Sequence, residues 1–221
     1  MSAKINGLSG STLKIIAIIL MVIDHIGAIL FPNLIVLRII GRSAFPIFCF
    51  LLVEGLMHTH NKWHYALRLG IFALISQVPF SLALADTPIY LEHLNVFFTL
   101  FIGLLMLIGF EYSKEQSLSC IVIFICAIFV ADTLRTDYGA MGIMIILIFY
   151  FYNKQKNFLG LAIALFIVNS LSPSTQIFSV FSLIPIYFYN GKRGISLKYV
   201  FYIFYPVHLL ILYFIGHYLD K

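Results

Sequence analysis

Long apolar blocks, separated by short connections that hold most of the charged residues, constrain this chain more than any other feature. The blocks cover residues 12–31, 39–57, 65–85, 94–110, 118–131, 138–152, 158–171, 177–189 and 199–218. Only 10% of the residues are charged, against about 25% in an average globular domain. A soluble fold of this size needs a far more polar surface, so the blocks predict segments that lie in a lipid bilayer.

The blocks predict helices rather than strands. Strands that cross a membrane are about ten residues long and alternate in polarity, and these blocks do not alternate. We therefore expect an all-α, polytopic transmembrane bundle of about nine helices, formed by one domain over residues 1–221. Several central blocks are shorter than the ~20 residues that span hydrocarbon, so the number is uncertain by about one helix. Lys4 and Lys14 precede the first block as in a signal peptide, but no small-residue cleavage pattern follows, and we interpret it as an uncleaved helix.

The basic residues predict the orientation, because cytoplasmic connections are enriched in Lys and Arg. If nine helices alternate, ten of the 14 basic residues share the side of the N-terminus. These are Lys4, Lys14, Lys62, Arg68, Lys114, Lys154, Lys156, Lys192, Arg193 and Lys198, and the other side has Arg38, Arg42, Arg135 and Lys221. We expect a multi-pass protein of the cell membrane, with a cytoplasmic N-terminus and an outer C-terminus. The net charge of +5 then reflects orientation, and we expect no nucleic-acid partner.

The first block contains Lys14, Asp24 and His25. A charge at the bilayer centre costs about 2.5–3.5 kcal/mol, so Asp24 and His25 are expected to face the protein interior or a water-filled cavity. Lys14 and His25 are three helical turns, roughly 16 Å, apart on one face. A cation at the mouth and an imidazole deeper on that face suit a long donor molecule with an anionic end and a reactive end. The alternative is structural: Lys14 reaches lipid headgroups and His25 packs against a carbonyl group.

The second block places Arg38 and Arg42 on the side that disfavours basic residues, one helical turn apart. A specific partner is therefore expected: Asp24, another outer carboxylate or an anionic intermediate. Pro46 allows a kink that frees backbone groups. Glu54, near the cytoplasmic end of the block, is a further candidate for a cavity residue.

Other polar residues divide between connections and the last block. The connections after the third and fifth blocks contain Asn95 and Asp132, which either line an acceptor mouth or belong to solvated loops. Tyr205 interrupts the last block and His208 lies midway along it, where an inward imidazole needs a partner. We expect no metal site, because no Cys or carboxylate completes the set His58, His60 and His64. The three cysteines lie inside apolar blocks and give no disulfide framework.

Four segments of the chain resemble the TraX family over nearly its whole length. They are residues 13–27 with Asp24 and His25, residues 41–55 with Arg42, residues 95–99, and residues 204–210 with His208. The family is named for a conjugal-transfer protein linked to N-terminal acetylation of pilin. It is similar in turn to integral-membrane acyltransferases that use cytoplasmic acetyl-CoA. That class often carries an Arg, ten residues and then a His on its first helix, and here Lys14 stands in for the Arg, which keeps the charge but loses the bidentate fork.

The resemblance implies an acetyl-CoA-dependent acetyltransferase. Its donor phosphates bind near Lys14, and His25 is the general base for an amine or hydroxyl of a pilin-like protein or surface glycan. Arg42 stabilises the oxyanion, and His208 lines the same cavity. Asp24 is a further catalytic candidate, since it or another acid is expected to orient His25. Neighbours on a helix point about 100° apart, which favours an orienting group from elsewhere in the fold. The alternatives are a small membrane transporter, for which no internal repeat is visible, and a non-enzymatic pilus or conjugation assembly protein.

Overall fold

The computed structural model describes residues 7–90, 92–171, 175–196 and 198–219. Within these ranges the regular elements are all helical, and the only β pairing is two isolated bridges, Leu8 with Tyr189 and Leu94 with Thr136. The elements are α1 (Gly10–Ile29), α2 (Ile35–Gly41), α3 (Ala44–Met57), α4 (Lys62–Ala85), α5 (Val96–Tyr112), α6 (Ser117–Thr133), α7 (Gly139–Gln155), α8 (Phe158–Ser170), the 3-10 helix η1 (Gln176–Ser182), α9 (Leu183–Tyr187) and α10 (Lys198–Leu219). If α2–α3 and η1–α9 are each counted as one broken segment, the described chain forms nine helical segments. The all-α prediction is confirmed.

Four of these segments are long and apolar enough to cross a membrane: Gly10–Ile29, Ile35–Met57, Lys62–Ala85 and Tyr199–Leu219. The others are shorter. The 13 residues of α8 extend about 20 Å, less than the ~30 Å of a typical hydrocarbon core. The segments fit a multi-pass membrane protein.

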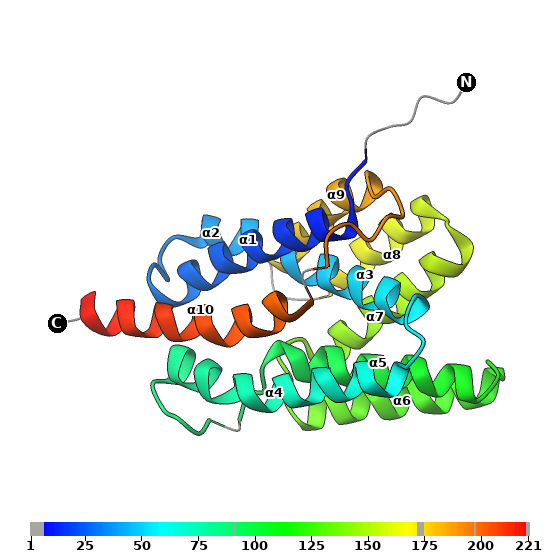
Figure 1. Cartoon of the computed structure of the whole chain (residues 1–221), viewed down its shortest axis with the longest axis horizontal. Coiled ribbons are helices and arrows are strands. Elements are labelled where there is room, and N and C mark those ends of the chain that lie inside the picture. The colour runs from blue at the N-terminus through cyan, green and yellow to red at the C-terminus, as the bar shows by residue number, and fades with distance from the viewer. Residues whose placement is uncertain (1–6, 91, 172–174, 197, 220–221) are drawn as a thin grey trace.

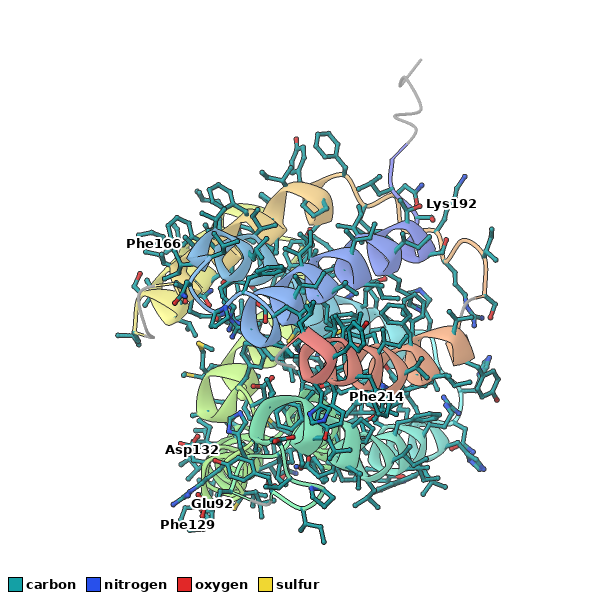
Figure 2. The ribbon with its side chains drawn as sticks, turned by 90° about the vertical axis from the view of Figure 1, so that its left-hand side faces the viewer. Glu92, Phe129, Asp132, Phe166, Lys192 and Phe214 are labelled. Carbon is teal, nitrogen blue, oxygen red and sulfur yellow. The ribbon has the colours of Figure 1, made fainter. Side chains whose placement is uncertain are left out.

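The outer faces of the bundle are apolar, as lipid contact requires. On α6 the only buried residues are Ala127 and Ala131, whereas Ile121, Ile125 and Phe129 are more than half exposed at a spacing of four residues. Phe129 and Phe166 point away from the bundle on its flanks (Figure 2). This face is what the composition predicts for helices in lipid.

The helices lie roughly along one common axis, and successive helical segments of the chain mostly run in opposite directions (Figure 1). α10 packs between α1 and α4, and α5 packs against α4, α6 and α7. We call the end where α1 begins the Lys14 end and the end where α1 finishes the His25 end. α1 begins and α10 finishes at opposite ends, as an odd number of crossings requires. Which end faces the cytoplasm stays a prediction, and Lys4 and Lys221 of the charge count lie outside the described residues.

Local sequence signals account for several helix ends. Four helices begin with a side-chain cap worth about 1 kcal/mol each: Ser9 accepts from the amide of Thr12, Asn61 from His64, Asn95 from Phe97 and Asn157 from Gly160.

The second block departs from its predicted form. It begins at Ile35 rather than residue 39, and the helix is interrupted between Gly41 and Ala44 rather than kinked at Pro46. Pro46 lies in the first turn of α3, where a missing N–H leaves no helical bond unmade. The interruption occurs where α2 touches α1: a Cβ on Gly41 would lie 2.3 Å from the Cβ of Asp24. Only glycine allows this approach.

Candidate functional site

His25 and His208 form a direct pair inside the bundle. The Nδ1 atom of His25 lies 2.7 Å from Nε2 of His208, and Nδ1 of His208 lies 2.9 Å from the carbonyl oxygen of Phe204. A carbonyl oxygen only accepts, so Nδ1 of His208 carries a proton and donates it. In neutral His208, Nε2 then accepts from Nδ1–H of His25. This leaves Nε2 of a neutral His25 without a proton, which is the state that a general base needs.

The carboxylate of Asp24 is held by two arginines, Arg38 of α2 and Arg42, which directly follows α2. Nη1 of Arg38 donates to Oδ2 at 2.5 Å, and Nη2 of Arg42 donates to both carboxylate oxygens at 2.7 and 2.8 Å, with Nε of Arg42 adding a bond at 3.1 Å. Asp24 is therefore the partner that Arg38 and Arg42 were predicted to need. As the helix geometry indicated, the group in contact with His25 comes from elsewhere, namely from α10.

Asp24, His25, Arg38 and Arg42 line a cavity of about 80 Å³ at the His25 end. His208 contacts His25 but, contrary to the prediction, does not line this cavity. Besides Asp24 and His25, its polar lining includes Asp137 and Tyr138 from the connection before α7. Asp137 accepts a hydrogen bond at 3.2 Å from Nε2 of His93, a residue of the α4–α5 connection. This bond to a carboxylate raises the pKa of His93 above its ordinary value of 6.5. A charged link between two connections thus lies beside the small cavity.

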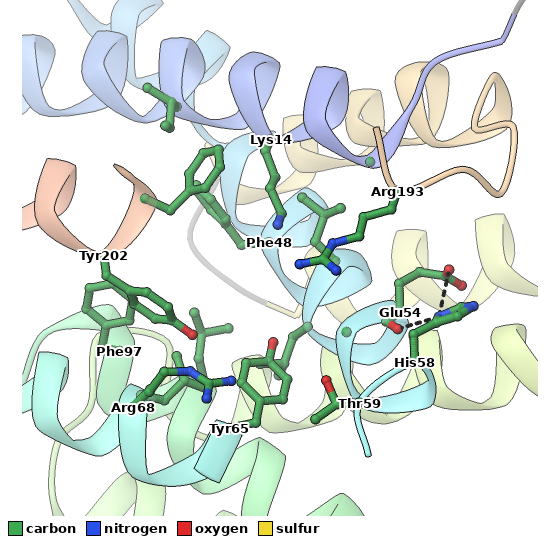
Figure 3. A pocket seen from close by; sticks show the side chains of 18 of the residues that line it. Lys14, Phe48, Glu54, His58, Thr59, Tyr65, Arg68, Phe97, Arg193 and Tyr202 are labelled. Atoms are coloured by element: carbon green, nitrogen blue, oxygen red, sulfur yellow. Dashed lines mark hydrogen bonds and ion pairs between the residues drawn. The ribbon is translucent and has the colours of Figure 1, made fainter. Parts of the chain in front are cut away.

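A larger cavity of about 340 Å³ occupies the Lys14 end. Figure 3 shows Lys14 from α1, Arg68 from α4 and Arg193 from the connection before α10 converging on it from three sides. Tyr65 and Tyr202 add aromatic surface. Three cations around a partly aromatic cavity suit a ligand that carries several phosphates and a flat ring.

The two cavities share part of their lining: Met21, Phe48, Val96 and Tyr205 appear in both. These four side chains form a thin boundary in the middle of the bundle, contributed by α1, α3, α5 and α10. A molecule in the cationic cavity and a molecule in the His25 cavity would therefore be separated by single side chains. The geometry brings three basic side chains and an imidazole to two adjoining cavities.

Comparison with known proteins decides the family. The family model described as "TraX protein" matches residues 9–216. This chain belongs to the TraX family. Among curated proteins, it is 34% identical to the probable fimbrial assembly protein FimC, serogroup H1, of Dichelobacter nodosus, over 92% of this chain and 94% of that protein. It is 29% identical to the uncharacterized protein RP591 of Rickettsia prowazekii (strain Madrid E), over 74% of this chain and 63% of that protein. No solved structure gives a significant match.

The other predicted site residues of this TraX family member are spread over the fold. Lys14 lies at the larger cavity, with its ammonium 5.2 Å from the ring centre of Phe201. Asn95 is fully buried and caps α5 while donating to Gln77. Asp132 is exposed and accepts from the amide of Ala140. Asn95 and Asp132 thus have structural roles in this geometry, outside both cavity linings.

Glu54 lies at the Lys14 end, on the edge of the larger cavity. Its carboxylate accepts hydrogen bonds from Asn153 and, at 3.2 Å, from the hydroxyl of Tyr189, and His58 lies beside it (Figure 3). Within the described ranges, no three His, Cys, Asp or Glu residues are grouped as metal ligands.

Three cavity residues of this TraX family member were not predicted as site residues from the sequence: Arg68, Arg193 and Asp137. Arg68 and Arg193 carried one signal, namely that both belong to the basic group on the side of Lys14. Asp137 stands in a connection that resembles any solvated loop. Their convergence depends on the packing of α1, α4 and α10, which no local pattern encodes.

Proposed function

We propose that this protein is a membrane acetyltransferase that moves an acetyl group from cytoplasmic acetyl-CoA to an amine or hydroxyl at the outer face of the cell membrane. The N-terminus and the larger cavity face the cytoplasm in this proposal, in agreement with the excess of basic residues at the Lys14 end. The observation that carries the proposal is the pair of cavities that meet at one boundary, with three cations in one and an imidazole base in the other.

The larger cavity is suited to the donor. CoA carries a pyrophosphate, a further phosphate and an adenine, and Lys14, Arg68 and Arg193 supply matching positive charge. From Lys14 to His25 the distance along α1 is roughly 16 Å, so the flexible arm of the donor bridges the two ends while its phosphates stay with the cations. Fixing both ends in this way lowers the entropic cost of bringing the thioester to the acceptor.

The smaller cavity is suited to the chemistry. Nε2 of His25 takes the proton from the acceptor amine or hydroxyl as that group attacks the thioester carbon. The bond to nitrogen or oxygen forms, the carbon–sulfur bond breaks, and the proton passes from His25 to the leaving thiolate. His208 keeps His25 in the required tautomer through the 2.7 Å bond, and Asp24 with its two arginines fixes α1 against α2.

The acceptor is proposed to be a pilin-like protein or a surface glycan. The relative from Dichelobacter nodosus is described as a probable fimbrial assembly protein, which favours a fimbrial subunit as the acceptor. A chain end or sugar that enters the small cavity does so beside Asp137 and His93, so an approach close to the membrane surface is expected.

The test uses sealed membranes that carry the protein, with acetyl-CoA labelled in its acetyl group on the larger-cavity side. Wild type is expected to transfer label to envelope protein or glycan, with a mass increase of about 42 Da per acetyl group. His25→Ala is expected to lose transfer, because it removes the group proposed to take the acceptor proton. His217→Ala is the matched control, since His217 is on α10 and lines neither cavity. Undiminished transfer by His25→Ala refutes the proposed chemistry.

A non-enzymatic role in assembly is the second candidate, and the printed name of the Dichelobacter relative is the observation that favours it. One variant distinguishes the two proposed functions. Fimbriae that assemble normally on cells with His25→Ala, while cells without the protein have none, favour assembly over acetyl transfer.

A further inference from the structure

Tyr205 has a buried hydroxyl whose proton has no acceptor. The residue is 3% exposed and lies on α10. The backbone N–H of Val96 approaches its oxygen, and none of the described residues accepts its proton. Burying a hydroxyl without a partner is unfavourable, and the cost is greater within hydrocarbon. A buried donor of this kind therefore indicates a group that arrives with a ligand.

The ring of Tyr205 packs against three other rings. It stands edge-on to Phe97, with ring centres 5.0 Å apart, and to His25 and His208, at 6.0 and 5.5 Å. Such packing leaves the ring little freedom. Tyr205 is also one of the four residues that line both cavities. Its side chain thus adjoins the proposed base and stands where the donor must cross.

A second source of positive potential lies at the same boundary. Val96 is the first residue of α5 and also lines both cavities. α5 has 17 residues, and Asn95 caps it by accepting the amide of Phe97. The start of a helix carries partial positive charge that stabilises a nearby anion. The hydroxyl of Tyr205 on α10 and the N-terminus of α5 thus lie at the same boundary between the two cavities.

Arg42 is less well placed to bind an oxyanion. Its Nε and Nη2 atoms are used in the bonds to Asp24, and Nη1 lies 3.5 Å from Oε1 of Gln176. Arg42 also lines only the smaller cavity.

We propose that Tyr205 is a catalytic residue that donates a hydrogen bond to the carbonyl oxygen of an acyl thioester held at the boundary between the two cavities. The inference rests on the proposed acetyl transfer and names the group that stabilises its transition state. When the acceptor attacks, the carbonyl π electrons move to oxygen, and this oxyanion accepts the bond from Tyr205. When the tetrahedral intermediate collapses, the C=O bond re-forms, the thiolate leaves, and Tyr205 keeps its proton throughout.

Tyr205→Phe removes only the oxygen atom and keeps the ring contacts. Loss of one donor to an oxyanion lowers kcat by about 100- to 1000-fold. The KM for acetyl-CoA should change little, because the cations at the Lys14 end hold the donor. Tyr213→Phe is the matched control: it removes the same atom from the same helix, outside both cavities.

The experiment measures release of the CoA thiol by protein in lipid nanodiscs, with cell-envelope extract as the source of acceptor. Binding of CoA itself, measured separately, reports whether each variant is folded. The proposal is supported by a 100-fold or greater fall in kcat for Tyr205→Phe, with CoA binding retained and Tyr213→Phe unchanged. It is overturned, with acetyl transfer left standing, if Tyr205→Phe keeps kcat within threefold of wild type or changes only KM. Absence of turnover in wild type with every acceptor extract overturns the proposed function and this inference together.

Discussion

Replacing Asp24 by Ala should destabilise this protein more than any other single removal of a charge. Asp24 is 9% exposed, and its carboxylate receives three bonds from Arg42 and one from Arg38 between 2.5 and 3.1 Å. The side chains of Arg42 and Arg38 are only 14% and 32% exposed. Asp24→Ala therefore leaves two guanidinium groups largely out of water without their counter-ion.

The expected magnitude follows from the loss of one partner in a buried pair, which costs about 3–5 kcal/mol. Arg42→Ala should cost less than Asp24→Ala, because Asp24 keeps Arg38 at 2.5 Å. Arg135→Ala is the control: Nη1 of its guanidinium group lies 4.0 Å from Oε2 of Glu92, and the two side chains are 67% and 73% exposed. An exposed pair of this kind contributes at most about 1 kcal/mol.

The assay is thermal or denaturant-induced unfolding of the protein in nanodiscs, followed by tryptophan fluorescence and by retention of a monodisperse elution peak. The order of destabilisation should be Asp24→Ala, then Arg42→Ala, then Arg135→Ala. If Asp24→Ala unfolds within about 1 kcal/mol of Arg135→Ala, the cluster does not hold α1 to α2 and the reasoning is wrong.

Three further predictions concern packing, pH and donor binding. Gly41→Ala should destabilise the protein by about 1–3 kcal/mol or more in the same unfolding assay, because the new Cβ would meet the backbone of Asp24. Gly216→Ala should leave the free energy of unfolding unchanged, because no atom lies closer than 3.5 Å to the new Cβ. The pKa of His93 is raised in the folded state, so the bond between His93 and Asp137 should add its full stability below the unfolded pKa near 6.5. This added stability should disappear as the pH rises through the folded pKa, and unfolding measured from about pH 5 to 9 tests it. Lys14→Ala should raise the KM for acetyl-CoA more than it lowers kcat in the thiol-release assay.

A specific result would contradict each of these three predictions. Equal stability of the two glycine variants would contradict the close approach of α2 to α1. A pH dependence that survives in His93→Gln would assign the titration to another group. A Lys14→Ala variant with an unchanged KM, measured beside Lys14→Arg, would place the donor phosphates elsewhere.

The helical class and the membrane setting follow from composition and block length, because hydrocarbon excludes unpaired backbone groups and leaves little choice of structure. The same reasoning marked Asp24, His25 and His208, since a polar group in an apolar block needs a partner. Exact segment ends were less predictable: the start of α2 at Ile35 and the interruption after Gly41 depend on contact with α1.

The sequence by itself therefore determined that the apolar segments form helices of a multi-pass membrane protein and that a few of their polar residues need internal partners. Only the tertiary structure decided which partners these are. His25 meets His208 across 183 positions of sequence, and Lys14, Arg68 and Arg193 meet at one cavity from three separate segments. Pairing over such separations depends on how whole helices pack, and that packing is set by the sum of many side-chain contacts rather than by any local pattern.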